Sequence, residues 1–352
     1  MLGAVSGAKT IGRYFTVVSF LPSVPFVAYV VLLVRSGAWG GGVHFGQALA
    51  KVDAVDGLFL AIGSLVFAMA VHPLQFAIVQ AFEGYWGDSG PAARVATWRI
   101  QRHRKLCHRL DKRAANLDDS YGTGAHPVSR IGAPRIEVAQ LVQAVESSRR
   151  RTFYPADLEM IMPTLLGNVL RRYEIEVGRA YGLDCLTVLP RIMQRADQRD
   201  IDYVQNQRTQ LDLAVRTAAL SMAACLLTLV FMLNHLWLLL AFIPLGLAWA
   251  AYRGAVRVAH EYGMALAVLV EYNRFTLYEQ MHMQLPKGLE AERELNGHLI
   301  PLLGLDPEDR GRDPDSRTIE YRHPDPGSTP ATDPAPSTGQ TPTSGAGSVA
   351  PD

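Results

Sequence analysis

The sequence has little cysteine, and it lacks the common motifs of nucleotide-binding and hydrolytic enzymes. Cys107, Cys185 and Cys225 are its three cysteines and form no CxxC pair, a pattern that excludes a disulfide-stabilised secreted domain. The phosphate-loop patterns GxxxxGK(S/T) and GxGxxG and the catalytic patterns GxSxG and HExxH are also absent. His103 lies four residues before Cys107, but no second pair at ligand spacing is nearby. We therefore predict no catalytic residue, no cofactor and no metal site.

Long apolar runs are what the sequence has in abundance, and they set the fold class. A helix needs about 20 residues, at 1.5 Å each, to cross the roughly 30 Å hydrocarbon core of a bilayer. Four runs approach or exceed that length, at residues 14–34, 57–81, 214–233 and 236–252. The break at Asn234-His235 predicts a tight hairpin between the last two runs. The predicted class is mainly α: a polytopic α-helical membrane protein with four transmembrane helices and a cytoplasmic helical domain.

The basic residues of the connecting segments predict the orientation. Residues 94–151 hold thirteen Lys or Arg and five Asp or Glu, whereas residues 35–56 hold only Arg35 and Lys51 as basic residues. Basic segments stay on the cytoplasmic side of a membrane. Residues 35–56 are therefore predicted to be an external loop, and both termini, including residues 1–13, are predicted to be cytoplasmic. We expect a multi-pass protein of the cell (cytoplasmic) membrane.

Residues 82–151 form a basic region next to the second span. We predict a helix that begins at Pro91, a loop at residues 116–134 and a second helix at Arg135–Arg151. Basic side chains close to a membrane attract anionic lipid headgroups by about 1 kcal/mol each. The predicted headgroup contacts are Arg99, Arg102, Arg104, Lys105 and Arg109. A topology signal on a solvated face explains the same charges, whereas nucleic-acid binding would need a recognised motif, and none is present.

Three glycines mark the segment at residues 152–213, within the stretch PTLLGNVLRRYEIEVGRAYGLD at residues 163–184. If this stretch is one helix, its apolar residues share one stripe, and Arg172 and Glu176 lie opposite at pairing distance. Between the two faces lies an edge along which another backbone can approach closely. We predict that a helix or a protein partner contacts this edge. It consists of Gly167, Arg171, Glu174, Gly178 and Gly182, with Gly182 as the C-terminal cap.

The remaining segments are assigned by composition. The sequence CLTVLPR at residues 185–191 predicts a short extended segment, and a polar helix from Arg191 is expected to run into the third span. Arg216 is expected to snorkel from the mouth of that span. The fourth span is expected to continue outward as a cytoplasmic helix at residues 253–303. Residues 304–352 are acidic and rich in proline, and they predict a disordered tail.

Several phrases occur in an order that resembles a known family. These are PTLLGNVLRRYE, YGLD and LPR, then RTQLDLAVR before a span, and finally AYRGAVRVAHEYG, YNRFTLYEQM and LPKGLEAERELN. The chain is similar to actinobacterial integral membrane proteins of unknown function, from about Phe82 to about Leu303. The resemblance implies two spans, a cytoplasmic signature segment and two more spans, with no activity attached. Leu165 replaces the family's usual arginine, Leu189 its usual tryptophan, and Glu271-Tyr272 its usual Phe-Asp pair.

Two functions remain open at this stage. The preferred interpretation is a non-enzymatic interaction or scaffold protein that acts through its cytoplasmic helical domain. Its expected partners are anionic membrane lipids and either an unknown protein or a second copy of the chain, and no nucleic acid. The alternative is a small transporter or a membrane-bound enzyme or sensor component. His72 would then be a candidate residue, because it is the one ionisable residue well inside a predicted span.

Overall fold

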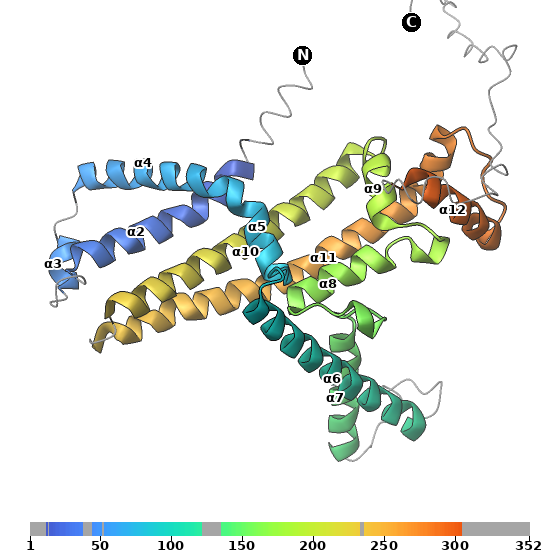
Figure 1. Ribbon diagram of the computed structural model, residues 1–352, viewed down its shortest axis with the longest axis horizontal. Helices are drawn as coiled ribbons and strands as arrows, with labels where there is room; N and C mark the ends of the chain where they lie inside the picture. The colour runs from blue at the N-terminus through green and yellow to red at the C-terminus, as the bar shows by residue number, and fades with distance from the viewer. Residues whose placement is uncertain are drawn as a thin grey trace, which may run out of the picture.

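The structure is a computed structural model that describes residues 14–37, 44–50, 53–121, 135–232 and 236–304, together with Gly12. The described residues form helices and turns and contain no strand. Figure 1 shows long helices running side by side in one half of the molecule, and further helices packed in the other half on the extensions of two of them. The predicted mainly α class is confirmed.

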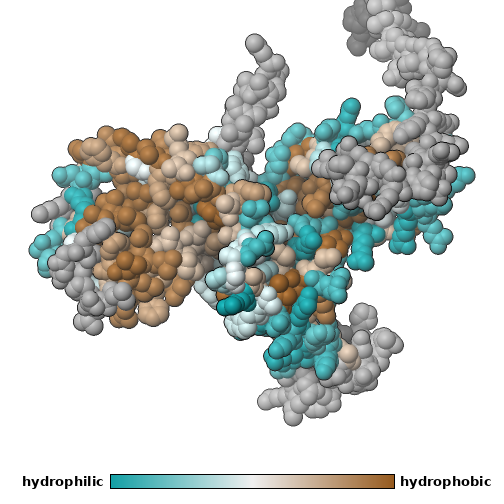
Figure 2. Space-filling model, viewed as in Figure 1, coloured by the Kyte–Doolittle hydropathy of each residue, from teal (hydrophilic) through white to brown (hydrophobic). Residues whose placement is uncertain are grey.

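Four of the described helical segments are long and apolar enough to cross a membrane. They run over Phe15–Arg35, Ala54–Glu83, Gln198–Met232 and Trp237–Gln280, in agreement with the four predicted spans. Figure 2 shows that the visible face of this half is mostly hydrophobic, whereas the other half is mostly hydrophilic. Such a surface suits lipid, since helices satisfy their own backbone hydrogen bonds and present only apolar side chains.

The first two spans each contain a local departure from α-helical geometry. The first consists of the π-helical turn η1 (Phe15–Phe20) and α2 (Leu21–Arg35). The second consists of α4 (Ala54–Val71), the 3-10 turn η2 (His72–Leu74) and α5 (Gln75–Glu83). Pro73 has no backbone N–H to donate, so the α-helix breaks there. Figure 1 shows α5 turning away from α4 to cross α10. A short helix, α3 (Phe45–Ala50), lies in the predicted external loop.

The third and fourth spans are parts of longer helices. These are α10 (Gln198–Met232), then the 3-10 turn η6 (Leu236–Ala241) and α11 (Phe242–Gln280). Both α10 and α11 run side by side beyond their apolar parts into the polar half (Figure 1). The two helices therefore stay paired beyond their apolar parts. Their extensions are the support on which the polar half is built.

The polar half contains the remaining helices. They are α6 (Gly90–Tyr121), α7 (Arg135–Arg151), η4 (Leu158–Met160), α8 (Leu165–Glu176), η5 (Arg179–Tyr181), α9 (Cys185–Met193) and α12 (Leu289–Leu303). One buried core joins α5, α8, α9, α10 and α11 through Val79, Leu166, Val188, Val215 and Ala259. Helices α6 and α7 pack on each other and project from this body as an arm (Figure 1).

Several predicted boundaries are wrong. Residues 185–191 belong to helix α9, not to an extended segment, because Asp184 accepts a hydrogen bond from the Thr187 N–H and caps the helix. The polar helix before the third span begins at Gln198, not at Arg191. The segment at 253–303 is the end of α11 and a separate α12, and α6 continues to Tyr121 through part of the predicted loop.

The glycine-marked stretch is not one helix, so only the first part of its predicted edge forms. Gly167, Arg171 and Glu174 lie in α8 and line one small crevice, whereas Gly178 and Gly182 lie beyond the end of α8. Helix α8 ends at Glu176, and both Gly178 (φ +80°) and Gly182 (φ +75°) adopt left-handed backbone conformations on either side of η5. Glycine adopts these angles with little strain. The two residues therefore redirect the chain, and Gly182 ends the short turn η5 instead of a long helix.

At Gly167, in contrast, another backbone does approach closely. A Cβ atom on Gly167 would lie 1.9 Å from the carbonyl oxygen of Glu83, the last residue of α5. Thr164 caps α8 by accepting from the Gly167 N–H at 3.0 Å, and its hydroxyl donates to the same Glu83 oxygen at 2.8 Å. The start of α8 is thus fixed to the end of the second span. Gly167 is covered by α5 and is not exposed to a partner.

Arg216 joins three spans, and the prediction that it snorkels is wrong. Its side chain is 0% exposed. The Nη1 atom donates to Ser19 Oγ at 3.0 Å and to Gln75 Oε1 at 3.4 Å, and Nη2 donates to the Ala68 carbonyl at 3.4 Å. Helix α5 crosses α10 at the level of Arg216 and covers its side chain. From the sequence alone, this side chain was expected at the exposed end of the third span.

Three predictions fall outside the described residues. They are the hairpin turn at Asn234 and His235, most of the N-terminal segment 1–13, and the tail beyond Gly304.

Candidate functional site

The strongest concentration of charge lies on α6, just after the end of the second span. Arg99, Arg102, Lys105 and Arg109 follow one another at spacings of three or four residues, so they share one side of the helix. Trp98 lies beside them, with the Arg102 guanidinium carbon 5.8 Å from its ring centroid. This side of α6 combines positive charge with an exposed aromatic ring.

The basic side of α6 faces the fourth span across a cavity of about 700 Å³, which we call the proximal cavity. Its far wall is formed by Trp249, Tyr252 and Arg253 of α11. Arg253 lies over the Trp249 ring, 5.3 Å from its centroid. The lining residues are Trp98, Arg99, Gln101, Arg102, His103, Lys105, Leu106, Arg109, Tyr154, Leu165, Trp249, Tyr252 and Arg253.

Two lining residues of the proximal cavity, His103 and Tyr154, form a half-buried contact. His103 Nδ1 and the Tyr154 hydroxyl are 3.0 Å apart. Burial lowers the pKa of His103 to about 4, with a further contribution from the neighbouring Arg99. One turn along α6, burial raises the pKa of the Cys107 thiol to about 11. The shifts favour the neutral imidazole of His103 and the protonated thiol of Cys107 at pH 7, and Cys107 packs in a small core with Leu110, Tyr154 and Ile161.

A second cavity of about 580 Å³ continues along α11, and we call it the distal cavity. It shares Leu106, Tyr154, Leu165 and Arg253 with the proximal cavity, so the two form one cleft. Its other lining residues are Leu110, Glu146, Arg149, Arg150, Thr152, Phe153, Val256, Arg257, His260 and Glu261. The cleft as a whole lies between α6, the end of α7 and α11.

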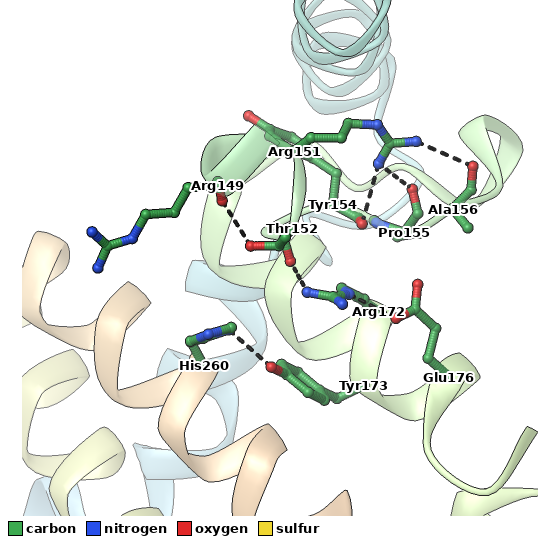
Figure 3. A network of polar contacts seen from close by, with 10 residues as sticks. All are labelled: Arg149, Arg151, Thr152, Tyr154, Pro155, Ala156, Arg172, Tyr173, Glu176 and His260. Atoms are coloured by element: carbon green, nitrogen blue, oxygen red, sulfur yellow. Dashed lines mark hydrogen bonds and ion pairs between the residues drawn. The ribbon is translucent and has the colours of Figure 1, made fainter. Parts of the chain in front are cut away.

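The linker between α7 and α8 is attached to α6 beside the cleft. Figure 3 shows Arg151 donating to the carbonyl groups of Tyr154, Pro155 and Ala156. Arg151 also pairs with Asp111 of α6 at 2.9 Å. These bonds tie the end of α7 and the linker to α6, which positions Tyr154 at the boundary between the two cavities.

A second group of contacts ties the linker to α8 and α11. Arg172 of α8 donates to the Thr152 carbonyl and pairs with Glu176 at 2.7 Å, as their spacing predicted. The Tyr173 hydroxyl lies 2.9 Å from His260 Nδ1 on α11 (Figure 3). A Cβ atom on Gly263 would lie 2.0 Å from the Tyr173 ring, so Gly263 is what lets α8 and α11 approach.

The electrostatics of the cleft are strongly one-sided. Among the described residues that line the proximal cavity there are five Lys or Arg and no Asp or Glu. Arg102, Lys105, Arg109 and Arg253 form no ion pair with any residue that the structure describes. The distal cavity contains Glu146 and Glu261, and Glu146 is occupied by Arg150 at 2.9 Å.

Four of the five predicted headgroup contacts lie together in this cleft. Arg99, Arg102, Lys105 and Arg109 all line the proximal cavity, whereas Arg104 points elsewhere and donates to the carbonyl groups of Leu158 and Glu159. Sequence reasoning missed the opposite wall. Its members are Arg149, Trp249, Arg253, Arg257 and His260. The signal that could have found Trp249 and Arg253 is their position at the boundary of the fourth apolar run.

The other candidate residues lie away from the cleft. Arg171 pairs with Glu174 at 3.3 Å on the surface of α8, beside a crevice of only about 10 Å³ that Gly167 also lines. His72 lies in the second span, with its Nδ1 2.8 Å from Ser19 Oγ. Ser19 is in turn bonded to Arg216, so His72 belongs to the contact between the spans and not to the cleft.

The chain matches no known protein-family model, no curated protein and no solved structure. The resemblance to actinobacterial membrane proteins therefore stays a prediction.

Proposed function

We propose that the protein is a non-enzymatic, membrane-anchored binding protein whose cytoplasmic helical domain holds the headgroups of anionic lipids in the basic cleft. The observation that carries this proposal is the composition of the proximal cavity, with five cationic side chains and no acidic one among its described lining residues. A phosphate group would pair with guanidinium groups through charge-assisted hydrogen bonds. Cations without a protein counter-ion at the base of a span are suited to that task.

The position of the cleft favours a lipid over a soluble anion. Trp98 and Trp249 line the proximal cavity and are 57% and 63% exposed. Tryptophan is enriched where apolar chains meet headgroups. On the side of α11 toward the membrane, Leu245 and Phe242 are also exposed. An acyl chain can therefore lie along α11 while its phosphate reaches the arginines.

We also propose the orientation in which the cleft and both termini face the cytoplasm of the cell. The support is the excess of basic residues in 94–151 over 35–56. The three native cysteines are buried, so a single cysteine placed at the exposed Leu289 can be labelled without background. Labelling of Leu289→Cys by an impermeant maleimide in intact cells would contradict the orientation, and labelling only after permeabilisation supports it.

The lipid proposal is tested on the full chain purified in a neutral detergent. Native mass spectrometry compares the retention of phosphatidylglycerol with that of phosphatidylcholine. We expect phosphatidylglycerol to be retained preferentially, and Arg102→Gln/Arg109→Gln to weaken its retention about tenfold or more, at about 1 kcal/mol for each cation. The matched control is Arg195→Gln/Arg199→Gln, which removes the same charge from exposed positions outside the cleft. Equal retention of the two lipids, or an equal loss in the control, would overturn the proposal.

One observation favours the alternative of a small transporter or a membrane-bound enzyme or sensor component. Arg216 is fully buried among the spans and connects through Ser19 to His72. Ionisable residues inside spans often mark a pathway. Both large cavities described above lie beside α6 instead, away from this cluster, and we therefore rank binding first.

A further inference from the structure

We propose that the cleft selects a lipid whose headgroup carries two phosphate groups, with one phosphate in the proximal cavity and the other in the distal cavity. The inference rests on the proposed function, since it concerns the ligand of the same site. It goes further by assigning a ligand class and by giving a role to Arg149 and Arg257, which no motif in the sequence singles out.

The first argument is continuity. The two cavities are lined in common by Leu106, Tyr154, Leu165 and Arg253. Arg253 is exposed and lies at the point where they join. Its guanidinium group can contact a phosphate on either side, and a ligand that fills one cavity has a direct path into the other.

The second argument is the distribution of charge along α11. Arg253 and Arg257 are four residues apart and therefore about 6 Å apart along the helix axis. Arg257 lines the distal cavity together with Arg149 from the end of α7. Figure 3 shows the Arg149 side chain reaching out from α7 on the side where His260 lies, with no bond drawn to its guanidinium group. The distal cavity thus has its own pair of cations, separate from those of α6.

The third argument is the number of charges. The proximal cavity has five cationic residues and no acidic one among its described lining. The distal cavity has four, against Glu146 and Glu261, and Arg150 already pairs with Glu146. A headgroup with one negative charge would leave most of these cations without a counter-ion. A headgroup with two phosphates places an anion in each cavity, and basic pockets beside spans are known to hold such headgroups.

The fourth argument concerns the acyl chains. On α11, Phe242, Leu245 and Trp249 are 66%, 41% and 63% exposed, at spacings of three and four residues. They form one apolar stripe that leads from the membrane to the proximal cavity. A soluble diphosphate would make no use of this stripe. We therefore assign the ligand as an amphiphile whose chains stay in the membrane.

The experiment compares three probes on the full chain in neutral detergent or in nanodiscs with a phosphatidylcholine background. Cardiolipin has two phosphates, phosphatidylglycerol has one, and inorganic diphosphate has no chains. Cardiolipin is used at half the mole fraction of phosphatidylglycerol, so that the total negative charge is equal. We expect cardiolipin to be retained at least about fivefold more tightly than phosphatidylglycerol, and inorganic diphosphate not to displace it at the same concentration.

The variants separate the two cavities. Arg149→Gln/Arg257→Gln is expected to reduce the preference for cardiolipin over phosphatidylglycerol to about one. Arg102→Gln/Arg109→Gln is expected to weaken the retention of both lipids. Arg195→Gln/Arg199→Gln again controls for net charge, and the thermal unfolding midpoint of each variant shows that it is folded.

The outcomes distinguish a failure of the two-phosphate inference from a failure of the proposed function. Equal retention of cardiolipin and phosphatidylglycerol at matched charge would overturn the two-phosphate inference and leave the proposed function standing. An unchanged preference in Arg149→Gln/Arg257→Gln would also overturn the inference. Displacement of cardiolipin by inorganic diphosphate would overturn the assignment of an amphiphile, because the acyl chains would then contribute nothing to retention. Retention of neither lipid above phosphatidylcholine would overturn both proposals.

Discussion

At the scale of single residues, the contact between His103 and Tyr154 fixes the depth of the cleft. Tyr154 is 5% exposed and packs in a small core with Cys107, Leu110 and Ile161. This core attaches the α7–α8 linker to α6. His103 stays neutral to make the contact, because burial and Arg99 both disfavour its protonated form. Protonation of His103 would place another charge beside Arg99 and Arg102 at the base of the cleft.

The stability of the protein is therefore expected to depend on pH through His103. Unfolded histidine takes up a proton near pH 6.5, whereas folded His103 does so only near pH 4. Between these values the unfolded state binds more protons, so the free energy of unfolding falls as pH is lowered. We expect His103 to account for about 1–2 kcal/mol of the loss between pH 7 and pH 5, since solvent screens part of the effect.

The measurement is thermal or chemical unfolding in one detergent at both pH values. Carboxylates contribute to the same pH range, so the wild type is compared with His103→Gln, which keeps a polar group beside Tyr154 and does not titrate. The variant is expected to lose less stability than the wild type on acidification. His108→Gln, at an exposed position on the same helix, is the control. Identical pH dependence in His103→Gln and the wild type would contradict the assignment.

Sequence could predict only one wall of the cleft. The cations of α6 lie within a single helix, and their spacing alone places them on one side. Arg149 and Arg253 come from the end of α7 and from α11, and their approach to α6 depends on the contacts that tie α7, α8 and α11 together. No local pattern encodes such an approach. The prediction that Arg104 contacts a headgroup failed for the same reason, since its hydrogen-bond partners Leu158 and Glu159 lie in the α7–α8 linker.

At the scale of elements, the junction between α5 and α8 connects the membrane half to the polar half. Two glycines permit it. A Cβ atom on Gly167 would lie 1.9 Å from the Glu83 carbonyl oxygen, and one on Gly84, where φ is +107°, would lie 2.8 Å from Pro163 Cδ. The end of α5 and the start of α8 thus lie directly against each other. The second span is thereby linked directly to the helix that packs on α11.

Gly167→Ala is expected to destabilise this junction. The added methyl group would meet the backbone of α5, which has no side-chain rotation to relieve the clash. Overpacking of this kind costs about 1–3 kcal/mol, which exceeds the gain of about 1 kcal/mol in helix propensity. Thermal unfolding in detergent is the measurement. Gly297→Ala in α12 is the control, since nothing lies within 4 Å of its Cβ position, and it should raise stability. An unfolding midpoint for Gly167→Ala at or above that of the wild type would count against the close approach.

The glycines also explain why one long helix was predicted where α8 and the separate turn η5 occur. On a helical wheel Gly167, Gly178 and Gly182 fall on one edge, but the wheel assumes that the helix continues. Gly167 is helical, whereas Gly178 and Gly182 have positive φ values. One local and one tertiary contact accompany these angles. A Cβ atom on Gly178 would lie 2.9 Å from Leu183 within the same turn, and a Cβ atom on Gly182 would lie 3.3 Å from the carbonyl oxygen of Arg293 in α12. Helix α9 was missed for a related reason, because its nine residues are too short to show periodicity.

At the scale of the whole molecule, four spans could be predicted because apolar runs of that length have few other uses. The packing of the spans against one another could not be predicted from the sequence. Arg216 is surrounded by groups from the other spans, namely Ser19, Gln75 and the Ala68 carbonyl, and it has no ion pair with any described residue. Removing a charge from water costs several kcal/mol. The hydrogen bonds of Arg216 compensate this cost poorly, because two of the three are as long as 3.4 Å.

This balance makes a definite prediction for two substitutions of Arg216. Arg216→Met keeps most of the volume and removes the buried charge, so we expect stability in detergent to be unchanged or raised by about 1–3 kcal/mol. Arg216→Ala removes the same charge but leaves a cavity between the three spans, and we expect it to be less stable than Arg216→Met by about 2–4 kcal/mol. Arg199→Gln, exposed on the same helix, controls for net charge. If Arg216→Met unfolds at a much lower temperature than the wild type, the arginine is a net stabilising link between the spans. If the variant is as stable as expected, the residue is kept at a cost to stability, and the combination of Arg216, Ser19 and His72 becomes the first place to look for a transport function.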